Sequence, residues 1–193
     1  MRINGYMILV CLLAVLSACA LSPQTVTIEP ALQVEQAQAI GQGRTLALEV
    51  VDSRPNAIIG KRGGVYPETS SISTTGDITP NISRALSAVF SDYQFSVVEG
   101  NADGSLKMKV VIESIDYVAS GGSRVTGVTT SAVVGVVCVN GTREFTGRYR
   151  GNTSRDVFTP PDTEENQKLI NETLAKVLDR VVSDEKLLEF ISQ

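Results

Sequence analysis

The sequence predicts an α+β fold in two layers, in which two main helices pack on one face of a mostly antiparallel sheet. Three observations lead to this class. Strand-like alternation dominates the chain, two amphipathic helical stripes interrupt and end it, and Asn140-Gly141 joins two long β-like segments. The order strand, helix, strands, hairpin, helix is typical of helices gathered on one side of an antiparallel sheet. We expect one such domain over residues 44–193.

The first strand of this domain is expected over TLALEVVD, residues 45–52, where apolar residues alternate with small or polar ones. Residues 53–78 are rich in turn formers, with a short hairpin expected through 64–66 and 71–74. Thr79-Pro80 predicts a helix that begins with Thr79 as N-cap and Pro80 at the first helical position. Its apolar stripe consists of Ile82, Ala85, Leu86, Val89 and Phe90.

The second half of the domain begins with short and long strands at 95–98 and 105–118, and a slip in alternation near Ser114 indicates a β-bulge. Residues 123–139 and EFTGRYRG then form the two arms of a type I′ hairpin at Asn140-Gly141. Asp162 and Glu165 match a capping box at the start of a long helix. A last short helix over 185–191 is expected to pack back on the domain.

The N-terminus has the features of a bacterial lipoprotein signal. Residues 7–15 are apolar but too short to span a bilayer, which is typical of a signal peptide. Leu16-Ser17-Ala18-Cys19 resembles a lipobox. The resemblance implies cleavage between Ala18 and Cys19, a diacylglycerol on the Cys19 thiol and an acyl chain such as palmitate on the new N-terminus. We expect residues 1–18 to be removed, and Ala20, in place of Asp, favours the outer membrane.

Residues 19–43 are expected to be a lipid-anchored linker, because they contain Pro23, Pro30, Gly41, Gly43 and five Gln. A flexible segment of this length spans about 27 Å on average. A short strand near 25–28 is the alternative for part of it.

Composition narrows the possible activities. The chain contains no His and carries a formal net charge of −4. Catalytic sites and metal sites that depend on His are therefore excluded, and an acidic exported chain is not expected to bind nucleic acid. We expect no cofactor, no metal and no enzymatic activity. A hydrolase that uses carboxylates such as Asp52 or Glu113 is the less favoured alternative.

Two motifs near the first strand have both a structural and a functional interpretation. Gly60-Lys61-Arg62-Gly63 has the GXXG spacing of a KH loop but lacks the flanking helices of that fold. We expect a glycine-rich turn with two solvated basic residues. Its functional alternative is an interaction loop for an anionic lipid headgroup, a glycan or a protein partner. Asp52-Ser53-Arg54-Pro55 is interpreted as a turn held by side-chain to backbone hydrogen bonds, and a recognition turn is its functional alternative.

Two further features lie on the predicted hairpin. Arg148 and Arg150 share a strand face and could form a basic strip, although a solvated outer face of a sheet is the commoner explanation. Cys138 is the last cysteine after processing of Cys11 and modification of Cys19, and we expect a buried, unreactive thiol.

The lipobox, the VVDSRP strand and turn, the GKRG loop and the C-terminal VLDRVVSDEKLLEFI together resemble the YajG family of uncharacterised bacterial lipoproteins. The resemblance implies one α+β domain and a place in the cell envelope, with no catalytic residues to transfer. We therefore expect a lipid-anchored protein of the outer membrane that faces the periplasm of a Gram-negative bacterium. It would act as a non-enzymatic binding or assembly module for an envelope protein, lipid or glycan. A carrier with an apolar cavity between sheet and helices is the alternative.

Overall fold

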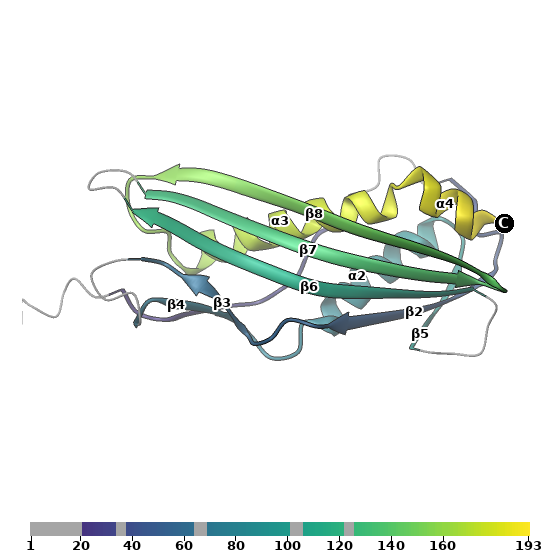
Figure 1. The fold of residues 1–193 in the computed structure, drawn as a ribbon, viewed down its shortest axis with the longest axis horizontal. Helices are drawn as coiled ribbons and strands as arrows, with labels where there is room; N and C mark the ends of the chain where they lie inside the picture. The colour runs from purple at the N-terminus through teal and green to yellow at the C-terminus, as the bar shows by residue number, and fades with distance from the viewer. Residues whose placement is uncertain (1–20, 34–37, 64–68, 101–105, 122–125) are drawn as a thin grey trace, which may run out of the picture.

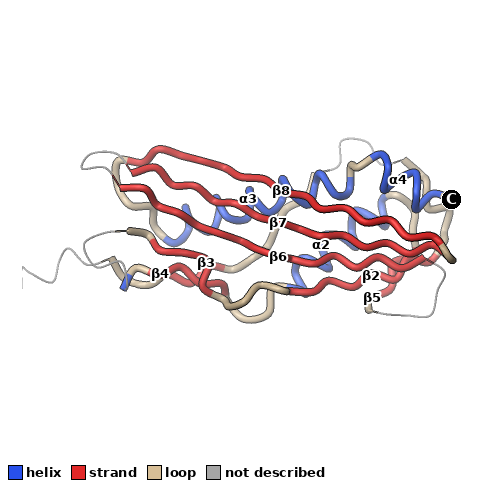
Figure 2. The backbone as a smooth tube through the Cα atoms, viewed as in Figure 1, coloured by secondary structure: helices blue, strands red, loops and turns tan. Residues whose placement is uncertain are grey.

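The computed structural model describes residues 21–33, 38–63, 69–100, 106–121 and 126–193, and it confirms the α+β class. Its strands form one layer and its helices lie together behind them (Figures 1 and 2). The strands are β1 (Gln24–Val26), β2 (Thr45–Asp52), β3 (Ile58–Lys61), β4 (Ser71–Thr74), β5 (Ser96–Glu99), β6 (Leu106–Gly121), β7 (Thr126–Asn140) and β8 (Arg143–Val157). The helices are α2 (Thr79–Asp92), α3 (Thr163–Val182) and α4 (Glu185–Ser192).

The sheet is mixed, with a more complex pairing than the sequence predicts. The three long strands β6, β7 and β8 pair antiparallel, as expected, and so do β3 and β4. The pairs β1–β4, β2–β5, β2–β6 and β3–β6 are parallel. Parallel neighbours cannot be joined by a hairpin, so the chain crosses over through α2 between β2 and β5.

Strand β6 organises this sheet because one of its edges serves two partners in turn. Its first half pairs with β2 up to Ile112, and its end pairs with β3 at Tyr117 and Val118. The register against β7 shifts between Ile112 and Ser114, which confirms the predicted bulge. The bulge therefore lies where β6 exchanges one partner for the next.

The hydrophobic core lies between the sheet and the helices. On β7 every second side chain from Val128 to Cys138 is buried, and the apolar stripe of α3 from Ile170 to Val181 is fully buried. Helix α3 runs along β7 and β8, whereas α2 lies against β2 and β5 (Figure 1). The opposite face of β6, β7 and β8 is not covered by any element in the described part of the chain, and we call it the open face.

The ends of two elements differ from the expectation. Helix α2 begins at Thr79 with Ile78 as N-cap, and the Asp77 side chain, not Thr79, accepts a hydrogen bond from the Thr79 N–H at 2.9 Å. In the hairpin, Asn140 pairs with Arg143, so the turn residues are 141–142 and only Gly141 has a positive φ. This is the pattern of a type II′ turn, with Gly first. The Asp162–Glu165 capping box of α3 is confirmed.

The linker expected over residues 19–43 is wrong for its described part. Strand β1 pairs with β4, and both Val26 and Ile28 are almost completely buried in the core. Burial of the Val26 and Ile28 side chains lowers the free energy of the docked segment, so this segment does not remain a free tether. The folded domain therefore begins near residue 21, and we call residues 21–33 the strap.

The strap lies along the helices and is held mainly by amide and carboxylate side chains of α3. Asn171 accepts from the Glu29 N–H at 2.8 Å and donates to the Thr27 carbonyl at 2.9 Å. The Gln167 and Asp179 side chains accept from the N–H groups of Thr27 and Gln33. On the side of α2, Asn81 donates to the Ile28 carbonyl at 3.0 Å. In Figure 1 this segment is the purple trace that crosses between α2 and α3.

Candidate functional site

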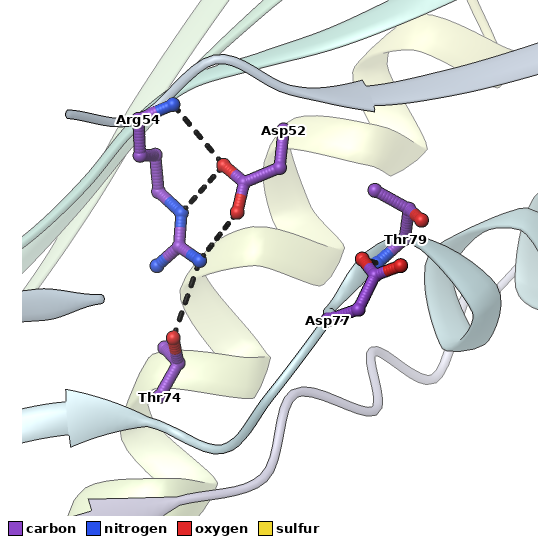
Figure 3. Close-up of polar contacts among 5 residues, drawn as sticks. All are labelled: Asp52, Arg54, Thr74, Asp77 and Thr79. Atoms are coloured by element: carbon purple, nitrogen blue, oxygen red, sulfur yellow. Dashed lines mark hydrogen bonds and ion pairs between the residues drawn. The ribbon is translucent and has the colours of Figure 1, made fainter. Parts of the chain in front are cut away.

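The Asp52–Arg54 turn contains the most deeply buried ion pair in the described residues, and Figure 3 shows its geometry. The Arg54 Nε donates to Asp52 Oδ1 at 2.8 Å and Nη2 donates to Oδ2 at 2.7 Å, so the pair is bidentate. The Arg54 backbone N–H also donates to Oδ1, at 3.1 Å. Only 4% of the Arg54 side chain is exposed, compared with 26% for Asp52.

This pair lies where the chain leaves β2 and crosses to β3 and β4. The Ser53 N–H still donates to the Ile112 carbonyl of β6 at 3.0 Å, and Arg54 Nη2 reaches Thr74 of β4 at 3.2 Å. The remaining Nη1 is buried without a hydrogen-bond partner among the described residues. The Asp77–Thr79 cap of α2 is nearby in Figure 3 but shares no hydrogen bond with the pair. The turn therefore acts as a junction between the two parts of the sheet.

The same geometry bears on the hydrolase alternative. Hydrogen bonds from the Arg54 side chain hold the pKa of Asp52 below its ordinary value of 3.8, despite the opposing effect of burial. A general acid at neutral pH needs the opposite shift. The other candidate, Glu113, forms an ion pair with Arg148 at 2.7 Å on the open face. Asp52 thus lacks the raised pKa of a general acid, and Glu113 is engaged by Arg148.

The expectation of a glycine-rich turn with two solvated basic residues is wrong for Arg62, which is buried, whereas Lys61 is exposed, and the interaction loop stays a prediction. Gly60 and Lys61 belong to β3, and a Cβ at Gly60 would lie 1.9 Å from the Tyr117 carbonyl oxygen of β6. Gly63 has a φ of +76° and its carbonyl accepts from Ser70. Glycine at 60 allows two backbones to approach closely, and glycine at 63 allows a left-handed conformation.

Arg62, which we expected to be solvated, is buried and holds the ends of three segments together. Its Nη1 donates to the Ser22 carbonyl at 3.1 Å and its Nη2 donates to the Pro161 carbonyl at 2.7 Å. With its amide oxygen turned toward Arg62, Gln24 accepts from the same guanidinium at 3.1 Å and 3.2 Å. One side chain thus connects the strap, β3 and the segment between β8 and α3.

Tyr117 completes this buried polar cluster. Burial raises the pKa of its hydroxyl, while the nearby positive charge of Arg62 acts in the opposite direction. A hydrogen bond with the Asn166 side chain also lowers this pKa, so Asn166 belongs to the same cluster. Nothing in the sequence pattern singles out this cluster, because its members come from four distant segments.

Arg148 and Arg150 both lie on the open face of β8, but they do not form an uncompensated basic strip. Arg148 donates to Glu113 through Nε at 2.8 Å and Nη2 at 2.7 Å, across β7. Arg155 pairs with Glu172 of α3, and Arg143 lies over the Phe190 ring. The positive charge of the hairpin is therefore divided between both faces.

The cavities beside the helices are open or small, unlike the apolar chamber expected of a lipid carrier. Two open grooves border the strap, one of about 410 Å³ against α3 and one of about 520 Å³ against α2. Both contain charged side chains, for example Lys168 and Arg84. The cavity between α3 and strands β7 and β8 holds only about 70 Å³, well below the size of typical ligand pockets.

The expected lipidation and cleavage residues, Cys19 and Ala18, lie outside the described residues. Cys138 is fully buried, and burial raises its thiol pKa to about 12. Within the described ranges, no group of His, Cys, Asp or Glu could hold a metal ion. Among the described helices, none combines the length and apolarity needed to cross a bilayer.

This chain matches one protein family and resembles several solved structures. The model of a protein family described as "Uncharacterized lipoprotein" matches residues 30–192. Protein XCC0632 from Xanthomonas campestris has a TM-score of 0.54 at 12% identity, over 88% of this chain and 97% of its own. A neuraminyllactose-binding hemagglutinin homolog from Helicobacter pylori has a TM-score of 0.53 at 11% identity, over 86% of this chain and 97% of its own. At these identities the likeness concerns the fold alone. A search of curated sequences gives no match.

Proposed function

Because the chain belongs to this family of uncharacterised lipoproteins, we propose that it is anchored through lipid on Cys19 to the outer membrane and faces the periplasm. There it acts as a non-enzymatic binding or assembly module of the cell envelope. The family match carries the proposal, because it covers nearly the whole folded domain. Cys19 at the end of a short apolar segment supports the anchor, and Ala20 supports the outer membrane.

The open face supports the binding role. It extends over β6, β7 and β8, and it contains a shallow groove between Glu113, Gly135, Val137 and Arg148. Val137 is 36% exposed, beside the Glu113–Arg148 ion pair. This face combines an exposed apolar side chain with a neutralised ion pair, which suits a protein partner. It suits a lipid chain or a polyanion less well, because it is neither uniformly apolar nor positively charged. The partner class proposed is therefore another protein of the envelope.

The anchor is tested by replacing Cys19 with Ala in the full chain. The wild-type protein is expected in the outer-membrane fraction with a mass increase at its N-terminal peptide that corresponds to acylation. The C19A variant is expected to lose both. A wild-type protein without acyl chains would contradict the proposed function.

The partner is tested by photoreactive residues in the lipidated protein in cells. A probe at Arg150 or Val137 on the open face is expected to capture one discrete envelope protein, identified by mass spectrometry. A probe at Lys168, on the outer side of α3, is the matched control. Capture at Lys168 but not at the open-face positions would refute this choice of surface.

A further inference from the structure

The start of the described chain and the most exposed aromatic side chain lie at the same end of the molecule. Phe158, between β8 and α3, is 87% exposed. It is followed by Pro161, whose carbonyl is bound by the same Arg62 guanidinium that binds the Ser22 carbonyl. In Figure 1 the end of β8, the start of α3, β3 and β4 all gather at this end. We call it the anchor end.

The distance between the lipid and the folded domain is short. Leu21 and Ser22 are already held, because Thr69 donates to the Leu21 carbonyl and Arg62 to that of Ser22. Two residues of extended chain span no more than about 7 Å, so Cys19 must lie within that distance of Leu21. A lipid on Cys19 therefore brings the anchor end to the membrane surface and leaves no room for a long flexible tether.

The apolar surface at this end fits such a contact. Single exposed apolar residues are common in proteins. Of the four large hydrophobic side chains that are exposed in the described chain, however, three belong to this half of the molecule. Besides Phe158 they are Ile58 of β3 and Val118 near the end of β6, each 58% exposed. Aromatic and aliphatic side chains that enter the headgroup region strengthen the membrane binding of a lipid-modified protein.

From these observations we propose that the anchor end docks directly on the phospholipid surface and that Phe158 inserts into it. This inference rests on the proposed lipid at Cys19. The exposed carboxylates of Asp156 and Asp162 flank the segment that contains Phe158, so the contact is apolar and not an attraction to anionic lipids. High salt should therefore leave it unchanged.

The chain contains no Trp, so one substitution gives a single fluorescent reporter. The test uses full-length, acylated F158W protein in vesicles of phosphatidylethanolamine with a minor share of phosphatidylglycerol, with or without brominated acyl chains. The expected result is a blue-shifted emission that brominated lipid quenches, at low and high salt. The matched control is acylated V137W protein, whose reporter lies on the open face, away from this end, and should not be quenched.

Each outcome decides one point. Acylated F158W protein that sits in the vesicles without quenching overturns the docking but leaves the anchor intact. Equal quenching of F158W and V137W overturns the end-on orientation, because the domain would then lie on its open face. A blue shift without quenching indicates burial against protein and also overturns the inference. Absence of acylation by mass spectrometry would instead contradict the proposed function itself.

Discussion

At the scale of single residues, the arginines show how the same side chain serves different purposes. Arg54 and Arg62 are buried, and each fixes segments that are distant in the sequence. Arg148 lies on the surface and is neutralised by Glu113. A sequence shows that a side chain is charged but not whether it is buried. An arginine can be buried only where the fold brings backbone carbonyls or carboxylates near its guanidinium group. This is why Arg62 was expected in solvent.

Replacement of Asp52 by Asn should destabilise the protein by about 2–3 kcal/mol at pH 7, because the buried Arg54 charge loses its carboxylate. The folded-state pKa of Asp52 is lowered from 3.8, so its contribution is present above pH 3.8 and is lost as the pH falls through the lower folded value. Urea unfolding at several pH values should show the gap between wild type and D52N narrowing toward pH 3. The R54K variant, which cannot make the bidentate pair, serves as a second measurement of the same contact. A constant gap would contradict the assigned role.

Replacement of Gly60 by Ala should cost about 3 kcal/mol or more, because the added Cβ would meet the Tyr117 carbonyl oxygen at 1.9 Å. The control is G141A, where nothing lies within 4 Å and only the φ of +63° is unfavourable. That variant should cost about 1–2 kcal/mol. Thermal unfolding of both variants measures the difference, and equal effects would contradict the close approach of β3 and β6.

At the scale of elements, most of the secondary structure follows from local patterns. The alternation in β2, the bulge in β6, the capping box of α3 and the apolar stripes of α2 and α3 are all encoded within a few neighbouring residues. The strap and the parallel pairs are not encoded in this way. They depend on contacts between segments far apart in the sequence, such as Gln24 with Ile72 in the sheet and Glu29 with Asn171 of α3. In the sequence alone, the polar stripe of α3 that binds the strap looks like a solvated face.

Replacement of Asn171 by Ala should loosen the strap, since Asn171 makes hydrogen bonds to two strap residues. The expected cost is about 1–2 kcal/mol, with faster amide hydrogen exchange at Thr27 and Glu29 than elsewhere. N152A, on the exposed outer side of β8, is the control and should leave exchange in the strap unchanged. If exchange in the strap stays the same in N171A, the two hydrogen bonds of Asn171 do not hold the strap.

At the scale of the whole molecule, the domain is one cooperative core between a mixed sheet and three helices. Cys138 lies near the hairpin end of β7 and is fully buried in this core, with a thiol pKa of about 12. Its reactivity therefore reports on opening of the entire core and not on a local site.

Native protein treated with a maleimide at pH 8 should show no labelling of the peptide that contains Cys138, because the buried thiol is neither ionised nor accessible. Labelling should appear at the denaturant concentration at which circular dichroism shows global unfolding. Peptide mapping by mass spectrometry measures it without interference from other cysteines. Labelling well before the unfolding transition would mean that the β7–α3 interface opens independently.

The strap would also set an order of events on the proposed route to the envelope. Its binding groove is built largely from α3, residues 163–182, so the strap can dock only after almost the entire chain is available for folding. If the chain is exported as proposed, the strap would still be undocked while most of the chain crosses the membrane, which would give the modifying enzymes time to act before the domain closes. The C-terminal third of the chain would then time the docking of the segment that follows the proposed lipid site.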